Sequence, residues 1–525
     1  MLKILLTIYL IFQAKSALSQ TRQLQASSDE DIIILHINDV HCGVNDTIGY
    51  DGFYLYREEL KRNYSNAITV DVGGHIEGGT MGSISDGSAI IEIMNEVGFD
   101  VTNLGNHEFD YGVEQLMKLK QNISSNYISS NFCYKKNKTA VLDTYKIIEK
   151  GGKKIAFIGV LTPLAFTKTY LSTIKDSDGE AMYDFLTGNN TQELYDRVQS
   201  HINEARNEKN ADYVILLTHI GMDLEDYTSN ELLSKLENVD AILDAHTHLI
   251  YNTTSKDKND KLIPIAQTGT KLPTIGKLTI KPNGTILSEI IRETPEPNNK
   301  TDAIQLTRGK KTVWISKKMN DFINSIYKKY ESELNIKYGH TDYELVALPK
   351  NTTNAHLSYC RYQECPLGNL IADAFKEVGN ANIAIVNGGT IKSGFDVGNI
   401  TRAEIIEASP YFDEIVVNQI SGQDILDMLE HGAKKCPNEE PGFPQCSGIK
   451  FDLNSGINSS VLTDAIGNFI NITGPRRVSN VKVEMNGKWE DLDLNKIYNV
   501  SINKFIADRG MDILWLLNMK YIMKL

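Results

Sequence analysis

The sequence predicts an α/β fold, because short apolar runs of strand length alternate with helical patterns through the first half of the chain. Leu194, Val198, Ile202 and Ala205 recur at helical spacing just before one of these runs, as expected of a βαβ unit. With 525 residues and 41% hydrophobic content, the chain has room for two or three domains with proper cores. Four of the runs are typical of buried parallel strands: Ile32–Ile37, Val101–Leu104, Val214–Leu217 and Val239–Leu243.

A polar motif stands at or just after the end of each of these four runs. The carboxyl ends of strands are where α/β sheets bind ligands, so we expect the motifs to converge. Imidazole nitrogens and carboxylate or amide oxygens are ligands of divalent ions such as zinc, manganese and cobalt. One such histidine would usually be structural, but four motifs together favour a metal site. In chain order they are Asp39-Val40-His41, Asn106-His107-Glu108-Phe109-Asp110, Thr218-His219 and His246-Thr247-His248.

The net charge of −13 argues against a nucleic-acid-binding protein, which would normally present a basic face. It does not argue against small anionic substrates, because a metal site and a few local cations decide that binding.

Both ends of the chain carry signals that predict the cellular location of the protein. Met1-Leu2-Lys3 and the apolar run that follows predict a secretory signal peptide, the alternative being a membrane anchor for which the run is short. Several Asn-x-Ser/Thr sequons support passage through the secretory pathway. The apolar residues 513–525 are interpreted as a last core helix. We therefore expect a secreted, extracellular glycoprotein with no membrane anchor after signal removal.

A turn-rich segment, Thr294 to Asn299, predicts a boundary between two parts of the chain. Beyond it, apolar residues fall mostly on one face of a predicted long helix: Val313, Ile315, Met319, Phe322, Ile323, Ile326 and Tyr330.

The motifs, in this order, resemble those of the 5′-nucleotidases, a family of secreted or periplasmic two-metal phosphohydrolases; the likeness runs from about Asp31 to about Asp512. It implies an N-terminal calcineurin-like metallophosphatase sandwich, a connecting helix and a C-terminal α/β 5′-nucleotidase substrate-binding domain. The expected divisions are a signal peptide over 1–19, the metallophosphatase domain over 30–295, a linker with the connecting helix over 296–338 and the substrate-binding domain over 339–525.

The resemblance also implies roles for the strand-end residues. Two divalent ions, zinc first and manganese or cobalt as alternatives, would activate a water and clamp the oxygens of the reacting phosphate. One ion would be held by Asp39, His41 and His248, and the other by Asn106, His219 and His246. His107 matches the catalytic histidine that stabilises the phosphoryl charge, Asp110 matches the acid that orients it, and Asn106 completes the catalytic set.

One position departs from the family pattern. The family bridges its two ions with the aspartate of a Gly-Asp pair, and this chain has Gly74 there, within Asp71-Val72-Gly73-Gly74-His75. Loss of a carboxylate shared by both ions should weaken the second ion site. A water or His75 could compensate in part, and a loop shifted by one residue is the alternative reading.

The second half carries the residues that match the family's nucleotide site. Lys392 stands where the family has an arginine, which keeps the charge but loses the two-pronged hydrogen bonding. Tyr411 and Phe505 match the two rings that sandwich the base. Asp512 matches the family's ribose contact, and the segment before it is one residue longer than in the family. The substrate-binding residues implied are Arg361, Asn387, Gly389, Lys392, Tyr411, Phe505 and Asp512.

The six cysteines fit an oxidising compartment. The spacing of Cys360 and Cys365 resembles a short disulfide loop of the family's extracellular enzymes. Cys436 and Cys446 enclose a loop that would let them pair, and Cys42 with Cys133 would pair by elimination, with a free thiol at Cys42 as the alternative.

Two functions follow. The first is a secreted nucleotide phosphohydrolase that releases phosphate from extracellular nucleotides through a two-metal-activated water. The alternative is a catalytically impaired, secreted nucleotide-binding protein derived from the same family. Monophosphate, di- or triphosphate and nucleotide-sugar preference stay open, as does a homodimer.

Overall fold

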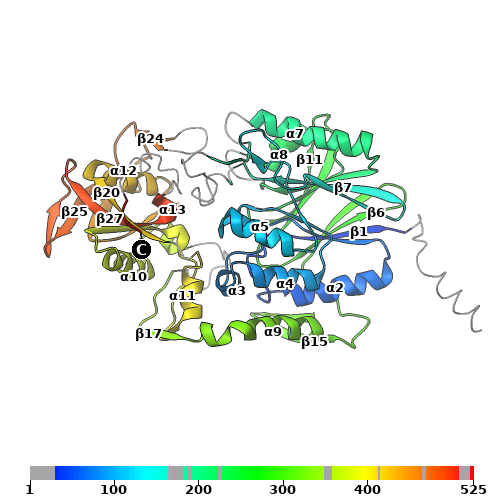
Figure 1. Ribbon diagram of the computed structural model, residues 1–525, viewed down its shortest axis with the longest axis horizontal. Helices are drawn as coiled ribbons and strands as arrows, with labels where there is room; N and C mark the ends of the chain where they lie inside the picture. The colour runs from blue at the N-terminus through cyan, green and yellow to red at the C-terminus, as the bar shows by residue number, and fades with distance from the viewer. Residues whose placement is uncertain are drawn as a thin grey trace, which may run out of the picture.

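Two six-stranded sheets packed face to face build the first half of the chain (Figure 1). The structure is a computed structural model and describes residues 30–163, 165, 181–186, 191–222, 227–347, 358–411, 414–463, 469–507 and 521–524. The predicted signal peptide and Asp512 lie outside these residues. We call the elements from β1 to β14 the first lobe and those from β17 to β28 the second lobe.

The first sheet has the order β14-β13-β1-β2-β3-β4, and its neighbours from β1 to β4 run parallel. Its strands are β1 (Ile32–Ile37), β2 (Ala67–Asp71), β3 (Val101–Asn103), β4 (Tyr127–Ile128), β13 (Ile275–Ile280) and β14 (Ile286–Ile291). The helices between them are α2 (Gly49–Asn63), α3 (Thr80–Ile84), α4 (Ser88–Val97), the short 3-10 helix η1 (Asn106–Phe109) and α5 (Gly112–Asn122).

The second sheet has the order β11-β12-β10-β9-β7-β6. Its strands are β6 (Tyr145–Lys150), β7 (Lys153–Leu161), β9 (Tyr213–His219), β10 (Ala241–Asp244), β11 (Ile250–Lys256) and β12 (Leu262–Thr268), and β5 (Cys133–Tyr134) pairs with β8 (Tyr183–Asp184) beside it. Helices α7 (Thr191–Asn203) and α8 (Ser229–Ser234) belong to this half, with a π-helical turn over Glu204–Glu208. The predicted βαβ helix before the Val214 run is therefore confirmed.

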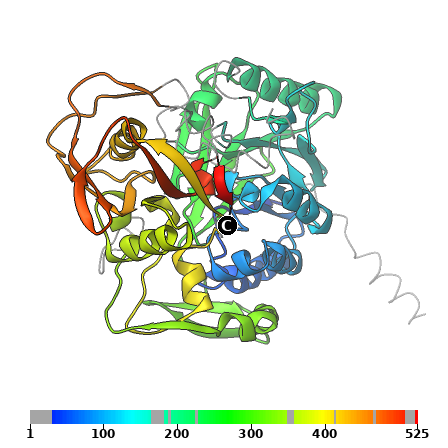
Figure 2. The same ribbon diagram turned by 60° about the vertical axis from the view of Figure 1, so that its left-hand side comes forward.

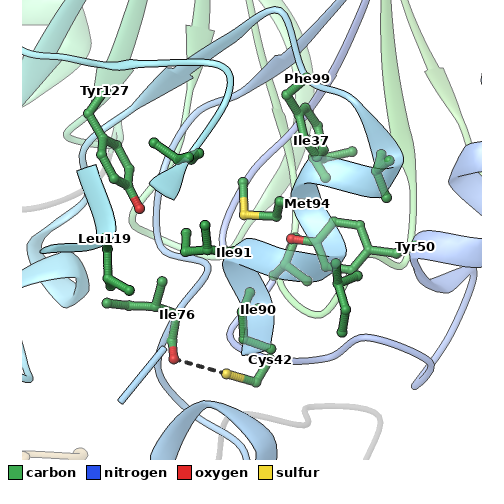
Figure 3. Packing of buried hydrophobic residues seen from close by; sticks show 14 of the residues in the cluster. Ile37, Cys42, Tyr50, Ile76, Ile90, Ile91, Met94, Phe99, Leu119 and Tyr127 are labelled. Carbon is green, nitrogen blue, oxygen red and sulfur yellow. Dashed lines mark hydrogen bonds between the residues drawn. The ribbon is translucent and has the colours of Figure 1, made fainter. Parts of the chain in front are cut away.

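Four layers result, with helices outside and the two sheets inside. Ile34 and Val70 of the first sheet and Phe157 and Leu217 of the second belong to one buried apolar cluster between the sheets. A second cluster joins the first sheet to α2, α4 and α5, and Figure 3 shows part of it, including the Cys42 thiol, whose Sγ donates to the Ile76 carbonyl oxygen at 3.1 Å. The four predicted strands all exist, but they come from both sheets.

The connection to the second lobe is a hairpin followed by a helix. Strands β15 (Ala303–Arg308) and β16 (Lys311–Ser316) precede α9 (Lys317–Leu334), which packs along α2 and α4 at the lower edge of Figure 1. The predicted helix was therefore too long, because Val313 and Ile315 lie on β16. Two buried residues separated by one position fit a strand as well as a helix. The Ser316 N-cap, whose Oγ accepts from the Met319 N–H at 3.0 Å, fixes the start of α9.

The second lobe is built on a five-stranded mixed sheet of order β21-β18-β27-β20-β28 (Figures 1 and 2). Its strands are β18 (Ile383–Asn387), β20 (Ile415–Ser421), β21 (Pro444–Ser447), β27 (Ile497–Asn503) and β28 (Tyr521–Lys524). Its helices are η5 (Tyr359–Arg361), α10 (Pro366–Val378), η6 (Gly388–Thr390), α11 (Arg402–Ala408), α12 (Gly422–Gly432) and α13 (Lys504–Ala507). Small sheets flank it: β17 (Lys337–Thr341) with β19 (Gly398–Thr401), β22 (Ile449–Leu453) with β25 (Val478–Met485) and β26 (Lys488–Asp491), and β23 (Val461–Thr463) with β24 (Phe469–Ile472).

The architecture confirms the predicted two-part α/β fold class and corrects two expectations. The predicted last core helix is wrong for Tyr521–Lys524, which pair with β20 as a strand, and residues 513–520 lie outside the described part of the chain. The disulfide between Cys360 and Cys365 is present, but Cys42, Cys133, Cys436 and Cys446 are free thiols, so the other two expected pairs are wrong. Within the residues described, none of the helices has the length and apolar character needed to cross a membrane.

Candidate metal centre

The loop after β1 places Asp39 and His41 against the loop after β2. The Asp39 N–H donates to the Gly73 carbonyl at 2.9 Å, and the His41 N–H donates to the Gly74 carbonyl at the same distance. This pairing continues beyond the strand ends, where Asp39 and His41 both have positive φ angles of 49° and 45°. Such angles are uncommon for residues other than glycine and are frequent at functional sites.

The Asp39 carboxylate is fully buried and faces three histidines. Oδ2 accepts from the Asn38 side-chain amide and from the His246 N–H, both at 2.8 Å. Oδ1 accepts no hydrogen bond from any described residue. It faces three imidazole nitrogens: Nε2 of His41 at 3.6 Å, Nε2 of His219 at 3.6 Å and Nε2 of His248 at 3.7 Å.

Hydrogen bonds on the far side of two rings aim them at Asp39. The Nδ1 atom of His41 lies 3.2 Å from Oε2 of Glu77, and Nδ1 of His219 lies 3.0 Å from the Val72 carbonyl. A carbonyl or carboxylate there holds the proton on Nδ1 and leaves Nε2 as the ligand atom. Nε2 of His219 is buried without a partner among the described residues. A bound divalent ion would satisfy such buried atoms, namely Oδ1 of Asp39 and Nε2 of His219.

Glu77 was not among the predicted ligands. It is 2% exposed, and its Oε2 lies within 3.2 Å of Nδ1 of both His41 and His107. The sequence signal for it was weak, because a single glutamate three residues after Gly74 matches no ligand motif.

Gly74 lies where the resemblance placed it, at the metal centre. A Cβ atom on Gly74 would lie 2.7 Å from Oδ1 of Asp39 and 3.1 Å from Cε1 of His219. Its φ angle is +79°, which side chains other than glycine rarely adopt. A side chain at this position would therefore point between Asp39 and His219.

His75 cannot compensate for the missing carboxylate, contrary to one expectation. Its Nδ1 lies 2.9 Å from Oδ1 of Asp71, and its Nε2 lies 2.7 Å from the Tyr127 hydroxyl. Both ring nitrogens are thus engaged in the core beneath the site. Glu108 fixes the turn above, because its carboxylate accepts from the N–H groups of Gly74 and His75 at 2.9 and 2.8 Å.

The remaining predicted ligands lie on adjoining loops. Asn106 begins η1, and its side-chain Oδ1 is buried with no hydrogen-bond partner among the described residues. The His246 ring centroid lies 5.2 Å from that of His219. Asp244, at the end of β10, steadies this region by accepting from the Thr218 hydroxyl at 2.7 Å and the Ala245 N–H at 2.9 Å.

His107 stands at the rim of this cluster. Its Nδ1 lies 2.6 Å from Oδ2 of Asp110 and 3.1 Å from Oε2 of Glu77. Burial lowers the pKa of the imidazole, but Asp110 and Glu77 outweigh it and raise that pKa above its ordinary value. A raised pKa keeps a proton available on a ring that faces the cavity.

A cavity of about 630 Å³ opens between the two lobes over this cluster. The first lobe contributes His41, Glu77, His107 and His248 to its wall, together with Lys271. The second lobe contributes Ser358, Arg361, Ile391 and Lys392. The structure therefore brings two predicted substrate residues, Arg361 and Lys392, to the predicted metal ligands.

Lys392 is a cavity cation that packs against an aromatic ring. Its Nζ lies 5.1 Å from the centroid of the Tyr411 ring, within reach of a cation–π contact. Burial, followed by the positive charge of Arg361, lowers the pKa of Lys392 to about 8.

The other predicted substrate residues occupy varied surroundings. Asn387 ends β18, and its Nδ2 donates to the Pro441 carbonyl at 3.2 Å while its Oδ1 accepts from Asn503 at 3.0 Å. Gly389 lies in η6, where a Cβ would come within 2.9 Å of Pro441. Phe505 lies half-buried in α13.

Two sequence families match the two halves of the chain. Residues 32–249 match the calcineurin-like phosphoesterase family, and residues 339–516 match the 5′-nucleotidase C-terminal domain. Protein 5NUC of Lutzomyia longipalpis is 24% identical over 561 residues, covering 95% of this chain and 89% of that protein. The trifunctional nucleotide phosphoesterase protein YfkN of Bacillus subtilis is 24% identical over 531 residues, which are 91% of this chain but only 32% of that longer protein.

Among solved structures, the 5′-nucleotidase precursor of Thermus thermophilus superposes with a TM-score of 0.69 at 20% identity. The match covers 94% of this chain and 93% of that chain. At this identity the likeness establishes the fold, including the succession of the two lobes.

Proposed function

We propose, since this chain belongs to the 5′-nucleotidase family, that it is a metal-dependent phosphohydrolase that releases phosphate from extracellular nucleotides. The cavity carries this proposal, because it joins the imidazole and carboxylate cluster of the first lobe to Arg361 and Lys392 of the second. Nucleotide phosphates need both elements, a metal centre beside the reacting phosphorus and cations for the remaining negative charge.

The first lobe would hold the catalytic metal. Asp39, His41 and His248 form a candidate metal-binding group, and Oδ1 of Asp39, which accepts no hydrogen bond from a described residue, supports it. Bound divalent ions would supply Lewis-acid polarisation of the phosphate and a water activated near neutral pH. The expected second ligand set, Asn106, His219 and His246, lacks the shared carboxylate because position 74 is glycine.

His107 would donate a hydrogen bond to the phosphoryl oxygens. Its Nδ1 is held by Asp110 at 2.6 Å, which leaves Nε2 of the same ring for the substrate. An oriented donor of this kind stabilises charge that develops during displacement at phosphorus.

The second lobe would supply substrate binding. Arg361 and Lys392 meet the cavity as cations, and Tyr411 packs beneath Lys392. Asn387, Gly389, Phe505 and Asp512 stay proposals for the nucleoside half. We also propose secretion with removal of about the first 19 residues, which fits the Cys360–Cys365 disulfide.

A second candidate function is nucleotide binding without turnover, and Gly74 is the observation that favours it. The two functions separate in a single set of measurements. Purified protein would be assayed for phosphate release from AMP, ADP, ATP, a UDP-sugar and a cyclic nucleotide with zinc, manganese, cobalt or calcium added. Calorimetry would measure binding of the same compounds.

Metal-dependent release that is lost in His107→Ala supports the hydrolase. Binding with no release under any metal supports the alternative. A protein that neither binds these compounds nor releases phosphate from them would overturn both proposals.

A further inference from the structure

We propose that Lys271 is a specificity-determining residue that, together with Arg361 and Lys392, holds the non-reacting phosphate of a nucleoside diphosphate or triphosphate. The cavity would then prefer these nucleotides to monophosphates, whose single phosphate is the reacting one. The inference rests on the proposed function in taking the cavity for a nucleotide site, and it names the substrate class of that site.

Lys271 belongs to the loop that supports the metal centre. Its backbone N–H donates to the Asp39 carbonyl at 2.9 Å, and its own carbonyl accepts from the Thr47 hydroxyl at 2.6 Å. Its φ angle is +59°, a left-handed conformation that is uncommon for residues other than glycine and frequent at functional sites. The backbone therefore fixes the start of this side chain beside Asp39, and the side chain takes no part in these contacts.

The ammonium of Lys271 lies beside the candidate metal-binding group rather than at it. Among the described residues, Nζ has one ion-pair partner within 4 Å, Oδ2 of Asp46 at 3.5 Å, and it pairs with neither Asp39 nor Glu77. Asp46 and Lys271 both line the cavity that also reaches the metal cluster. This position fits a phosphate next to the reacting one.

Three cations line the cavity from both lobes: Lys271 from the first and Arg361 and Lys392 from the second. Burial and the charge of Arg361 lower the pKa of Lys392 to about 8, and the charge of Lys271 adds to this lowering. The charges therefore lie close enough to repel one another. A polyanion between them would relieve that repulsion and accept charge-assisted hydrogen bonds.

The neighbouring acids leave this positive charge available. The side chains of Lys271 and Asp46 are each about half exposed, and an exposed ion pair of this kind contributes little. Glu77, the other acid of the cavity wall, faces His41 and His107. On the second lobe, Nε of Arg361 is buried without a hydrogen-bond partner among the described residues, which an anion in the cavity would supply.

The test compares the affinities of ADP and AMP by calorimetry with zinc present, in the His107→Ala background so that hydrolysis during the measurement is slow. We expect ADP to bind at least about 10-fold more tightly than AMP when position 271 is lysine. Lys271→Met keeps the length of the side chain but removes the ammonium, so it should reduce this preference to below about threefold and leave the AMP affinity unchanged. Lys271→Arg should keep the preference.

Asp46→Asn separates phosphate binding from a structural role. If the ion pair only steadied the loop, Asp46→Asn and Lys271→Met would weaken ADP binding equally. If Lys271 binds phosphate, Asp46→Asn frees its ammonium and leaves the ADP affinity equal or tighter. Lys281→Met, which removes a first-lobe lysine paired with Asp31, controls for the loss of one positive charge. Thermal unfolding of each variant checks folding.

Equal affinities for ADP and AMP, or an ADP preference that survives in Lys271→Met, would overturn the proposal. Equal losses in Lys271→Met and Asp46→Asn would also overturn it. Lys271→Gln, a second neutral variant, gives the same comparison if Lys271→Met misfolds. Phosphate release by the wild-type chain is measured in parallel. A chain that prefers ADP as expected but releases no phosphate would refute only the hydrolase function, and one that hydrolyses AMP without preferring ADP would refute only the role of Lys271.

Discussion

Histidines lie on both sides of the Gly73–Gly74 turn, and they differ in how their ring nitrogens are engaged. Beneath the turn, both nitrogens of His75 are engaged, one by Asp71 and one by Tyr127. Above the turn, Nδ1 of His41 and of His219 is engaged and Nε2 of both rings faces Asp39, where Nε2 of His219 has no hydrogen-bond partner among the described residues. Residue type is the same on both sides, so a ring nitrogen that faces the Asp39 carboxylate, rather than histidine itself, marks a candidate ligand.

We expect the largest effect from replacing His107, whose ring faces the cavity. His107→Ala removes the proposed donor to the phosphoryl group and should lower phosphate release by roughly 10²–10³-fold. Metal content should not change, because His107 is not among the proposed ligands. His340→Ala, an exposed histidine of the second lobe, is the control for handling and folding. Wild-type turnover in His107→Ala would remove this residue from the reaction.

The buried ring should matter for stability instead. His75→Ala removes the hydrogen-bond partner of the buried Asp71 carboxylate and of the Tyr127 hydroxyl, and it creates a cavity. We therefore expect the free energy of unfolding to fall by about 2–4 kcal/mol. Urea unfolding measures it. Zinc binding should persist under native conditions. A His75→Ala variant that unfolds like wild type but has lost its metal would contradict the contrast between His75 and the histidines that face Asp39.

The turn itself can be tested with a pair of variants. Gly74→Asp and Gly74→Ala both force a side chain into a positive-φ position and should each cost about 1–3 kcal/mol of stability. Only Gly74→Asp restores a carboxylate, so only it should raise the zinc count toward two and increase phosphate release. An equal count in both variants would show that the missing carboxylate does not limit the second ion.

Glu77 should tune the metal without binding it. Glu77→Gln keeps the shape of the side chain but removes the charge facing His41, and it should weaken zinc affinity by about 10–100-fold. Competition with a chelator measures this, with Glu114→Gln on the exposed side of α5 as the control. Unchanged affinity would mean that the 3.2 Å contact does not orient the ring.

We expect the smallest effect on the pH dependence of KM, through Lys392 of the second lobe. Because the pKa of Lys392 is lowered to about 8, its ammonium is charged below that pH and loses its proton above it. We expect the KM for nucleotides to rise several-fold between about pH 7 and 9. Lys392→Arg stays charged throughout and should flatten that rise. Identical pH profiles for the two proteins would exclude Lys392 as the titrating group.

The sequence was a good guide wherever the signal was local. Asp39-Val40-His41 just after β1 and Thr218-His219 at the end of β9 each follow an apolar run, and both appear at the metal centre. Val313 and Ile315 were misplaced because two alternating residues fit a strand and a helix equally well. The free thiols of Cys436 and Cys446 were missed because pairing depends on the directions of the Cβ atoms, which spacing does not encode.

The roles of Glu77, Glu108 and His75 could not be predicted for a related reason. Each depends on partners brought close by the fold, such as Glu108 with the N–H groups of Gly74 and His75, 34 and 33 residues away. A motif supplies the residue but not the direction in which its side chain points. The relation of Lys392 to the metal cluster likewise arises only when the two lobes close over one cavity.

X-ray absorption at the zinc edge of the loaded wild-type protein tests the metal centre of Asp39, His41 and His248 most directly. The account predicts a shell near 2.0 Å that contains the two imidazoles and the carboxylate oxygen of this group. Protein that binds no zinc, or zinc whose shell contains no imidazole, would contradict it.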